Sequence, residues 1–255
     1  MIDRDSSPLS PEPALRFSVR DWHAWSPDRE TKRAWLGWAG SDTATEADDA
    51  PLPGLPMMLR RRVTGIGQKT LGAALACRSV ADARYVLASR HGEFDRTVTI
   101  LTSLAEGEAP SPAEFSMSVH HGLAGLLSIH TGNRHGHTAV AGSLDSFGYG
   151  LVEAAGCLAE QPDRPVLLIY FDAPLPDSYD VFRVEAERDL PIALALTLGA
   201  PDDSGPNGSL SVSCTTRADE VPSESLALNF LRFLLDGTQS QSTAGGTMNW
   251  RWHRA

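Results

Sequence analysis

The chain has 255 residues, with 22 Lys and Arg against 32 Asp and Glu, so its formal net charge at pH 7 is -10. Its length and its hydrophobic content of 42% allow one large domain or two small ones with a sizeable core. An acidic chain lacks the basic face that supplies most of the affinity for nucleic acids and anionic membranes, so we expect neither as a partner.

The cysteines and the N-terminus indicate the compartment. Cys77, Cys157 and Cys214 are an odd number without CxxC spacing, which predicts neither a disulfide framework nor a zinc site. The start MIDRDSSPLSPEP carries charges and prolines where a secretory signal needs an apolar run, and no later run is apolar enough to span a bilayer. We therefore expect a soluble, cytoplasmic protein. Residues 1–14 are predicted to be a flexible tail and residues 15–255 a single domain.

The first predicted elements are a strand and a helix. Residues 15–25 alternate apolar and polar side chains, which predicts a strand. Ser26-Pro27-Asp28 then supplies an N-cap, a proline and an acid, so we expect a helix from there to about Trp38. Four tryptophans flank this unit, and their size favours packing anchors over a ligand-stacking surface. They are Trp22, Trp25, Trp35 and Trp38.

A solvated loop is expected over residues 40–56, followed by a basic run. Arg60, Arg61 and Arg62 fit a solvated face, with a dock for an acidic partner such as a carrier protein as the alternative. The pattern beyond them predicts a helix from about Gly67 to Ala76, a buried strand over residues 85–89 and a helix over residues 93–106.

The segment Phe115 to Ile129, FSMSVHHGLAGLLSI, contains no Asp, Glu, Lys or Arg. This pattern predicts one buried central helix. Gly122, Ala124 and Gly125 are small residues. The glycines lower the helix propensity of the segment, a cost that is understandable if another backbone passes close by. We expect tight packing there, including packing across a subunit boundary.

The remaining elements repeat a strand–helix–strand order, which indicates a layered α/β sheet. Buried strands are expected over residues 137–141, 166–171 and 191–198, with further strands over 210–214 and 249–253. Helices are expected over residues 147–160 and over 223–235, the second capped by Ser223. Residues 238–247 are rich in Gly, Ser, Thr and Gln and are predicted to be flexible.

The side chains that could carry chemistry form no complete motif. Five of the eight histidines lie between His120 and His137, but their spacing lacks the HExxH type of pattern, so we expect no metal. Ser146-Phe147-Gly148 is half of a GxSxG elbow, with Leu144 where the first glycine is needed. Neither GxxxxGK[ST] nor GxGxxG is present, so no nucleotide cofactor, and no cofactor of another kind, is expected.

Three segments, taken in order, carry a resemblance. SPAEFSMSVHHGLAGLLSI, AVAGSLDSFGYGLVEAAGCLAE and PVLLIYFDAPLPDSYDVF resemble the β-ketoacyl synthase-like N-terminal domain family. More narrowly, they are similar to the short chain-length-factor-type subunits of aryl polyene and related pigment biosynthesis. With the segments upstream, the resemblance covers about residues 55–182. It implies a thiolase-like layered α/β/α fold, truncated to about one thiolase half with extra C-terminal elements.

In active relatives the central helix carries the condensing cysteine at its N-terminus. Aligning Val119-His120-His121 with the Val-His-Asn that follows this cysteine places Phe115 at its position, and residues 114–118 contain no cysteine. The resemblance therefore implies a subunit that cannot condense alone, because condensation needs a thiolate to accept the acyl group. It would pair with a catalytic β-ketoacyl synthase as a heterodimer, meet the acyl carrier protein only indirectly, and close the end of the acyl tunnel.

The residues expected at the tunnel end or at the partner interface are Phe115, Met117, His120, His121, Gly122 and Gly125. Two alternatives stay open. One is a stand-alone thioesterase or acyltransferase that uses Ser116, Ser118 or Ser146 with His120 or His121. The other is a homodimeric scaffold without a tunnel.

Overall fold

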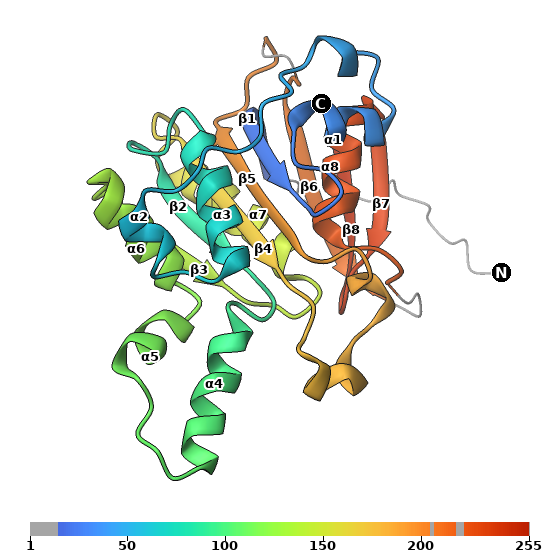
Figure 1. The fold of residues 1–255 in the computed structure, drawn as a ribbon. Helices are drawn as coiled ribbons and strands as arrows, with labels where there is room; N and C mark the ends of the chain where they lie inside the picture. The colour runs from blue at the N-terminus through green and yellow to red at the C-terminus, as the bar shows by residue number, and fades with distance from the viewer. Residues whose placement is uncertain (1–14, 205–206, 218–221, 255) are drawn as a thin grey trace, which may run out of the picture.

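The computed structural model describes residues 15–204, 207–217 and 222–254, so the predicted tail over residues 1–14 lies outside the described residues. One eight-stranded sheet runs through the described part, in the order β3-β2-β4-β5-β1-β6-β8-β7 (Figure 1). The strands are β1 (Leu15–Trp25), β2 (Arg84–Ala88), β3 (His137–Val140), β4 (Val166–Asp172), β5 (Ile192–Gly199), β6 (Leu210–Thr216), β7 (Ser240–Ala244) and β8 (Met248–Arg254).

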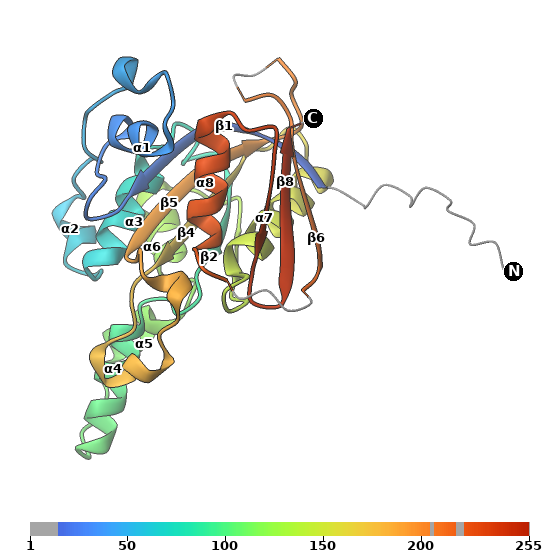
Figure 2. The ribbon, with the colours of Figure 1, turned by 90° about the vertical axis from the view of Figure 1, so that its right-hand side faces the viewer.

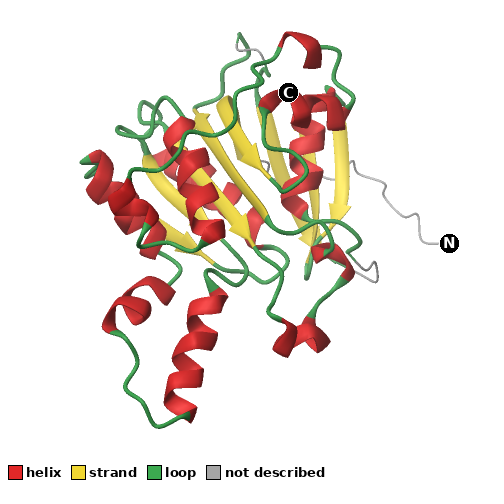
Figure 3. Ribbon diagram, in the orientation of Figure 1, coloured by secondary structure: helices red, strands yellow, loops and turns green. Residues whose placement is uncertain are grey.

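Helices lie on both sides of this sheet (Figure 3). The α-helices are α1 (Lys32–Ala39), α2 (Met57–Arg60), α3 (Gly65–Ala76), α4 (Phe94–Ala105), α5 (Pro112–Ser118), α6 (Gly122–Thr131), α7 (Ser146–Glu160) and α8 (Leu226–Asp236). Short 3-10 helices are η1 (Ala44–Glu46), η2 (Asp177–Phe182) and η3 (Glu185–Glu187).

The sheet is parallel at one end and antiparallel at the other. Strand β2 pairs in parallel with β3 and with β4. From β4 onward each neighbouring pair is antiparallel. All residues of β4 and β5 are buried, as expected for the nearly continuous apolar runs of strands covered on both faces. The prediction of buried strands is confirmed for these two.

Alternate residues of β4 belong to two separate cores. Leu168 and Tyr170 pack with α7 and α8, while Leu167 and Ile169 pack with α3 and α6. Because successive side chains on a strand point to opposite faces, α7 with α8 and α3 with α6 cover the two faces of the sheet. The first core is rich in aromatic rings, which include Phe147, Phe230, Trp250 and Trp252.

Two helix starts differ from the prediction. Ser26 does not cap a helix, because its backbone and that of Arg29 exchange hydrogen bonds of 3.0 and 3.1 Å and close a tight turn. Helix α1 begins at Lys32, and the Thr31 hydroxyl accepts a hydrogen bond from the Ala34 N–H at 3.2 Å. In the same way, α8 begins at Leu226 with Ser225 at its N-cap, so the prediction of Ser223 as the cap is wrong. Gly237 ends α8 in the left-handed conformation, as expected of a glycine that follows a helix.

The predicted single helix over residues 115–129 is wrong, since the segment forms α5 and α6 with a break at residues 119–121. Val119 is extended, with φ -78° and ψ 144°. The close approach expected at Gly122 exists within this chain, because a Cβ there would lie 3.3 Å from the Met117 carbonyl oxygen. The small residue therefore allows α5 to fold back on the start of α6.

Two further predictions are wrong. Strand β3 is an edge strand with alternating exposure rather than a buried one. Residues 238–247, predicted to be flexible, contain β7, which pairs with β8. The buried Asp145 carboxylate explains the order at the turn between them. It accepts hydrogen bonds from the Gly246 and Thr247 N–H groups at 3.0 and 2.7 Å, and from Trp250 Nε1 at 2.8 Å.

Candidate functional site: an arm with an uncovered apolar side

Helices α4 and α5 project together from the sheet as an arm, clear of the body in both views (Figures 1 and 2). They contact each other, but α4 buries only Arg96, and α5 buries no residue. Two leucines of α4 are largely uncovered, since Leu101 is 48% exposed and Leu104 is 56% exposed. Phe115 on α5 is 64% exposed. Both helices of the arm therefore present large apolar side chains to solvent, which is typical of surfaces that bind another molecule.

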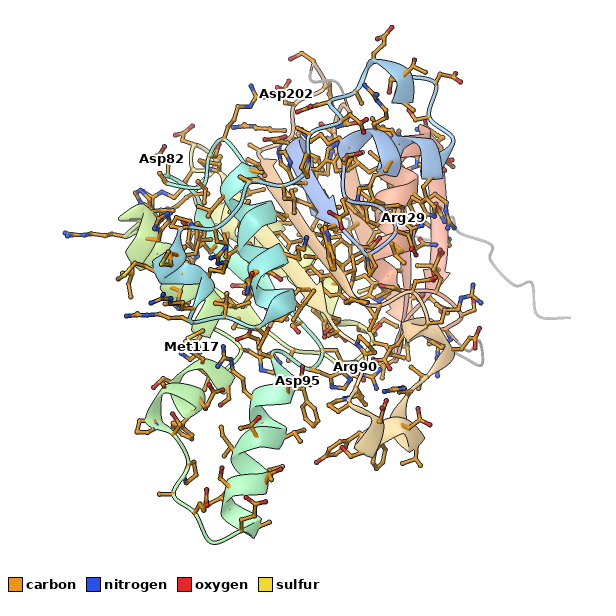
Figure 4. The ribbon with its side chains drawn as sticks, in the orientation of Figure 1. Arg29, Asp82, Arg90, Asp95, Met117 and Asp202 are labelled. Carbon is orange, nitrogen blue, oxygen red and sulfur yellow. The ribbon has the colours of Figure 1, made fainter. Side chains whose placement is uncertain are left out.

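The base of the arm is held by one buried arginine. Arg96 Nε donates to Glu93 at 2.8 Å, and its Nη1 donates to Glu114 of α5 at 2.7 Å. A third donor, Nη2, bonds the Arg62 carbonyl at 2.7 Å. Burial alone would lower the pKa of Arg96, but the bonds to the two carboxylates outweigh it and raise that pKa. Figure 4 labels Asp95, Arg90 and Met117 around this base.

A second group of hydrogen-bonded polar side chains lies at the carboxyl ends of the parallel strands. Asp172, the last residue of β4, is fully buried and accepts hydrogen bonds from the Ser89 hydroxyl at 3.0 Å and the Arg90 N–H at 2.9 Å. Its other oxygen accepts a 2.6 Å bond from the Tyr170 hydroxyl. Burial raises the pKa of Asp172 and, with the Asp172 charge, raises that of Tyr170 well above its usual range. These hydrogen bonds fix the loop that leads into α4.

The expected site residues lie along the arm and at its junction with α6. Phe115 points into the open, whereas Met117 is half-buried and packs against the core formed by α3 and α6. The His120 ring lies 3.6 Å from where a Cβ of Gly92 would be, and its buried Nε2 finds no hydrogen-bond partner among the residues that the structure describes. His121 is exposed and stacks on His137 at 5.9 Å. Nothing in the described residues lies within 4 Å of a Cβ at Gly125.

The serines considered as nucleophiles serve the backbone. Ser116 donates to the Pro112 carbonyl at 2.7 Å, Ser118 to the Phe115 carbonyl at 2.9 Å and Ser146 to the Ser143 carbonyl at 2.6 Å. A serine nucleophile needs its hydroxyl hydrogen-bonded to a base. Within the described ranges none of the three hydroxyls bonds a histidine, so the geometry gives the hydrolase alternative no support.

Sequence reasoning missed Arg96, Asp172 and Ser89. A signal for the last two existed, because each stands at or directly after the end of a strand predicted to be buried, and the carboxyl ends of neighbouring parallel strands meet at one edge of a sheet. No sequence signal singled out Arg96, because an arginine three residues after a glutamate in a helix most often forms a surface ion pair with it.

Residues 35–253 match the family described as β-ketoacyl synthase, N-terminal domain. The chain belongs to this family. The match extends well beyond the residues 55–182 that carried the resemblance and includes almost all of the C-terminal seventy residues. No curated protein sequence matches the chain.

Solved structures of this family and its relatives resemble the chain throughout. A chain from the ketosynthase ApeO in complex with its chain length factor ApeC, from Xenorhabdus doucetiae, is 29% identical with a TM-score of 0.80. That match covers 94% of this chain and 100% of the other. The complex named AntDE:AntF, a type II polyketide synthase acyl-carrier protein with its ketosynthase bound to the hexaketide, gives 11% identity and a TM-score of 0.66, covering 95% and 100%.

A β-ketoacyl synthase from Burkholderia phymatum STM815 gives 14% identity and a TM-score of 0.56, covering 88% of this chain and 71% of that one. At such low identity the last two matches bear on the fold alone. The predicted thiolase-like layered α/β fold is confirmed. Among the helices in the described residues, none combines the length and the apolar character needed to cross a bilayer.

Proposed function

We propose that this chain is a chain-length-factor-type subunit, without catalytic activity of its own, that pairs with a β-ketoacyl synthase and limits the acyl or polyene chain made by that partner. The products would be aryl polyenes or related compounds of fatty-acid or polyketide type. The observation that carries the proposal is the arm, whose apolar side this chain leaves uncovered. The 29% identity to a chain of the ApeO–ApeC complex, over its whole length, supports it.

The lack of catalysis rests on the sequence at the start of the central segment. Residues 114–118 are Glu, Phe, Ser, Met and Ser, so no thiol is present where the family resemblance places the condensing cysteine. The chain's own thiols lie elsewhere, and Cys77 and Cys157 are buried. A reaction that proceeds through an acyl-thioester on the enzyme therefore has no nucleophile here.

The arm suits an obligate partner. Leu101, Leu104 and Phe115 come from two helices held together by Arg96, so their side chains are presented on a braced support rather than on a loop. Apolar anchors of this kind carry most of the binding energy at protein interfaces. Phe115 is the side chain on this arm that we assign to the end of the partner's acyl tunnel.

The compartment and the domain limits belong to the same proposal. Within the described residues no disulfide joins Cys77, Cys157 or Cys214, which supports the reducing cytoplasm as the location. Residues 15–255 are taken as one domain, because one sheet joins β1 near the N-terminus to β8 near the C-terminus. The acyl carrier protein would meet the complex through the ketosynthase.

Co-expression with a β-ketoacyl synthase encoded beside this protein tests the pairing. We expect a stable one-to-one complex on a sizing column with light scattering. Leu104→Asp combined with Phe115→Asp places two charges in the arm and is expected to abolish co-purification. Met58→Asp, on an apolar residue of α2 that is 75% exposed, is the control and should leave the complex intact. A lone homodimer, or a complex indifferent to the arm variant, would contradict the proposal.

Covalent labelling tests the absence of catalysis. The purified chain is incubated with radiolabelled acyl- and malonyl-carrier proteins, alone and with its ketosynthase. Label is expected on the partner only, because this chain has no thiol at the start of its central segment. Label that stays on this chain after denaturing electrophoresis would instead favour the acyltransferase alternative.

Product analysis tests the assignment of Phe115. Phe115→Ala should shift the products of the complex to longer chains, and Phe115→Trp to shorter ones, because the tunnel end is a steric limit. Leu101→Ala, also on the arm, is the control and should keep the chain length. Unchanged products in all three variants would remove Phe115 from the tunnel end while leaving the pairing intact.

A further inference from the structure

A mixed cluster of ligand-type side chains lies away from the arm, at the middle of the sheet. Asp21 and His23 stand on β1, and Cys77 directly follows α3. One carboxylate oxygen, one imidazole nitrogen and the Cys77 sulfur all lie within 4.8 Å of one another. A register irregularity of β1 between Val19 and Asp21 sets Asp21 opposite Thr197 of β5. Such bulges redirect side chains and occur often beside functional sites.

In the metal-free protein, Asp21 is paired with cationic side chains of this chain. Burial alone would raise the pKa of Asp21, but hydrogen bonds from His23 and Lys32 outweigh it and keep that pKa well below the usual range. The Lys32 ammonium lies 3.0 Å from Asp21 Oδ1, and His23 Nε2 lies 3.7 Å from the same oxygen. Desolvation and the Asp21 charge raise the pKa of Cys77 to about 12, so in this state the sulfur keeps its proton.

Thr197 adds an independent observation. It is 2% exposed, and its hydroxyl lies within hydrogen-bond reach of the Cys77 sulfur, where it acts to lower the pKa of the thiol. A hydroxyl donor in this place stabilises a thiolate more than a neutral thiol, because hydrogen bonds to a charged acceptor are stronger. The Thr197 hydroxyl is therefore positioned to stabilise a Cys77 thiolate, although Cys77 is a neutral thiol in the metal-free protein.

We infer that Asp21, His23 and Cys77 form a binding site for a transition-metal cation of the Zn²⁺ type. One oxygen, one nitrogen and one sulfur ligand suit Zn²⁺, whereas Mg²⁺ and Ca²⁺ require several oxygens. The 3.7 Å between Asp21 Oδ1 and His23 Nε2 is near the roughly 3.4 Å that two such ligands have on one tetrahedral metal. The Cys77 sulfur, which lies within 4.8 Å of both atoms, must also move closer to share one metal with them.

The chemistry of binding is balanced without a redox step. Three metal–ligand bonds form, the Cys77 proton passes to solvent, and the Thr197 hydroxyl donates to the resulting thiolate. Asp21 also lines an open groove of about 610 Å³, together with Lys32 and Arg78, so a metal ion and a water as fourth ligand can enter from solvent. Lys32 must release Asp21 Oδ1 before the metal can bind there. The Lys32 ammonium therefore competes with the metal for this oxygen.

Cobalt titration of the reduced, full-length protein with its affinity tag removed tests the site. Co²⁺ is the probe, because a thiolate ligand gives it a near-ultraviolet charge-transfer band, and Zn²⁺ should then displace it. We expect the band to saturate at one Co²⁺ per chain. His23→Ala removes a metal ligand and should weaken binding by more than the roughly 10–100-fold that loss of a residue supporting a ligand costs. Lys32→Met should strengthen it, which distinguishes this site from a merely structural ion pair.

The cysteine variants decide the outcome. Cys77→Ser should lose the band, while Cys157→Ser, which removes another buried thiol, should keep it. Since Cys77→Ser could unfold, thermal melts of the wild type and of Lys32→Met with and without Zn²⁺ give a second measurement, with a larger rise in Tm expected for the variant. No band in the wild type, a band that survives Cys77→Ser in folded protein, or weaker binding by Lys32→Met would overturn the inference.

Discussion

The sheet and the arm use the same kinds of side chain in opposite ways. In β4 and β5 every residue is buried, and the apolar side chains meet others of this chain on both faces. In α4 and α5 comparable side chains are exposed, Leu101 by 48%, Leu104 by 56% and Phe115 by 64%, although Arg96 fixes the two helices to each other. The contrast separates apolar residues that stabilise this subunit from those that are available to another one. Substitutions in the first region should change stability, and those in the second should change assembly.

The largest effect is expected in the aromatic core. Phe147 is 1% exposed and touches Tyr170, Phe230 and Trp252, so Phe147→Ala leaves a cavity between α7, α8 and the sheet. We expect a loss of about 3–5 kcal/mol in the free energy of unfolding, measured by urea titration. Leu101→Ala in the arm is the control and should cost less than about 0.5 kcal/mol. Similar losses in both variants would break the comparison.

The next effect is expected at Asp145, which joins the start of α7 to the β7–β8 turn. Asp145→Ala removes one acceptor for Gly246, Thr247 and Trp250 and leaves buried donors unpaired. We expect a loss of about 3 kcal/mol in the free energy of unfolding. Asp163→Ala, at an exposed turn, should be neutral. Hydrogen exchange should show faster opening of β7 and β8 first.

A smaller and local effect is expected at the base of the arm. Arg96→Ala deprives Glu93 and Glu114 of their partner and separates α4 from α5. We expect a cost of about 2 kcal/mol, seen as faster hydrogen exchange in residues 94–118 with little change in the sheet. The exposed pair Arg188–Glu185 provides the control, because Arg188→Ala should change neither. If the sheet opens together with the arm, the two regions are one cooperative unit.

The smallest effect concerns acid stability in the sheet region. The pKa of Asp21 is lower in the folded state than its unfolded value near 3.9. Its contribution to stability is therefore fully present above that value and is lost as the pH falls toward the folded pKa. Asp21→Asn should flatten the loss of stability below about pH 4 in metal-free buffer, followed by circular dichroism. Asp95→Asn on the arm should leave the acid profile unchanged.

Much of the fold was predictable because its signals are local. The apolar runs of β4 and β5, the alternation in β1 and the glycine after α8 each depend on a few neighbouring residues. The break at Val119 was not predictable in this way, since an uncharged segment is equally compatible with one helix or with two helices packed on each other. Strand β7 has the composition of a flexible linker, and its order depends on pairing with β8 and on the bonds that Asp145, about a hundred residues earlier, makes with the turn between them.

The same difference applies to the candidate sites. Phe115 could be singled out by its place in the family resemblance, but its exposure depends on the projection of the arm, which no local pattern encodes. Asp21, His23 and Cys77 have no metal-site spacing along the sequence, so no local pattern groups them. The ligands come together only when α3 folds across β1, more than fifty residues apart along the chain.

The position of β1 bears on how the chain is made. Among the described strands it is synthesised first, yet its neighbours in the sheet are β5 and β6, which come from the last third of the chain. Strand β1 therefore stays unpaired until residues 192–199 of β5 have been synthesised, and its pairings with β6 span nearly two hundred positions. Such long-range pairing slows folding and prolongs the exposure of unpaired strand edges, which are prone to aggregation. Nascent chains halted before residue 192 should therefore associate with chaperones far more than the finished polypeptide does.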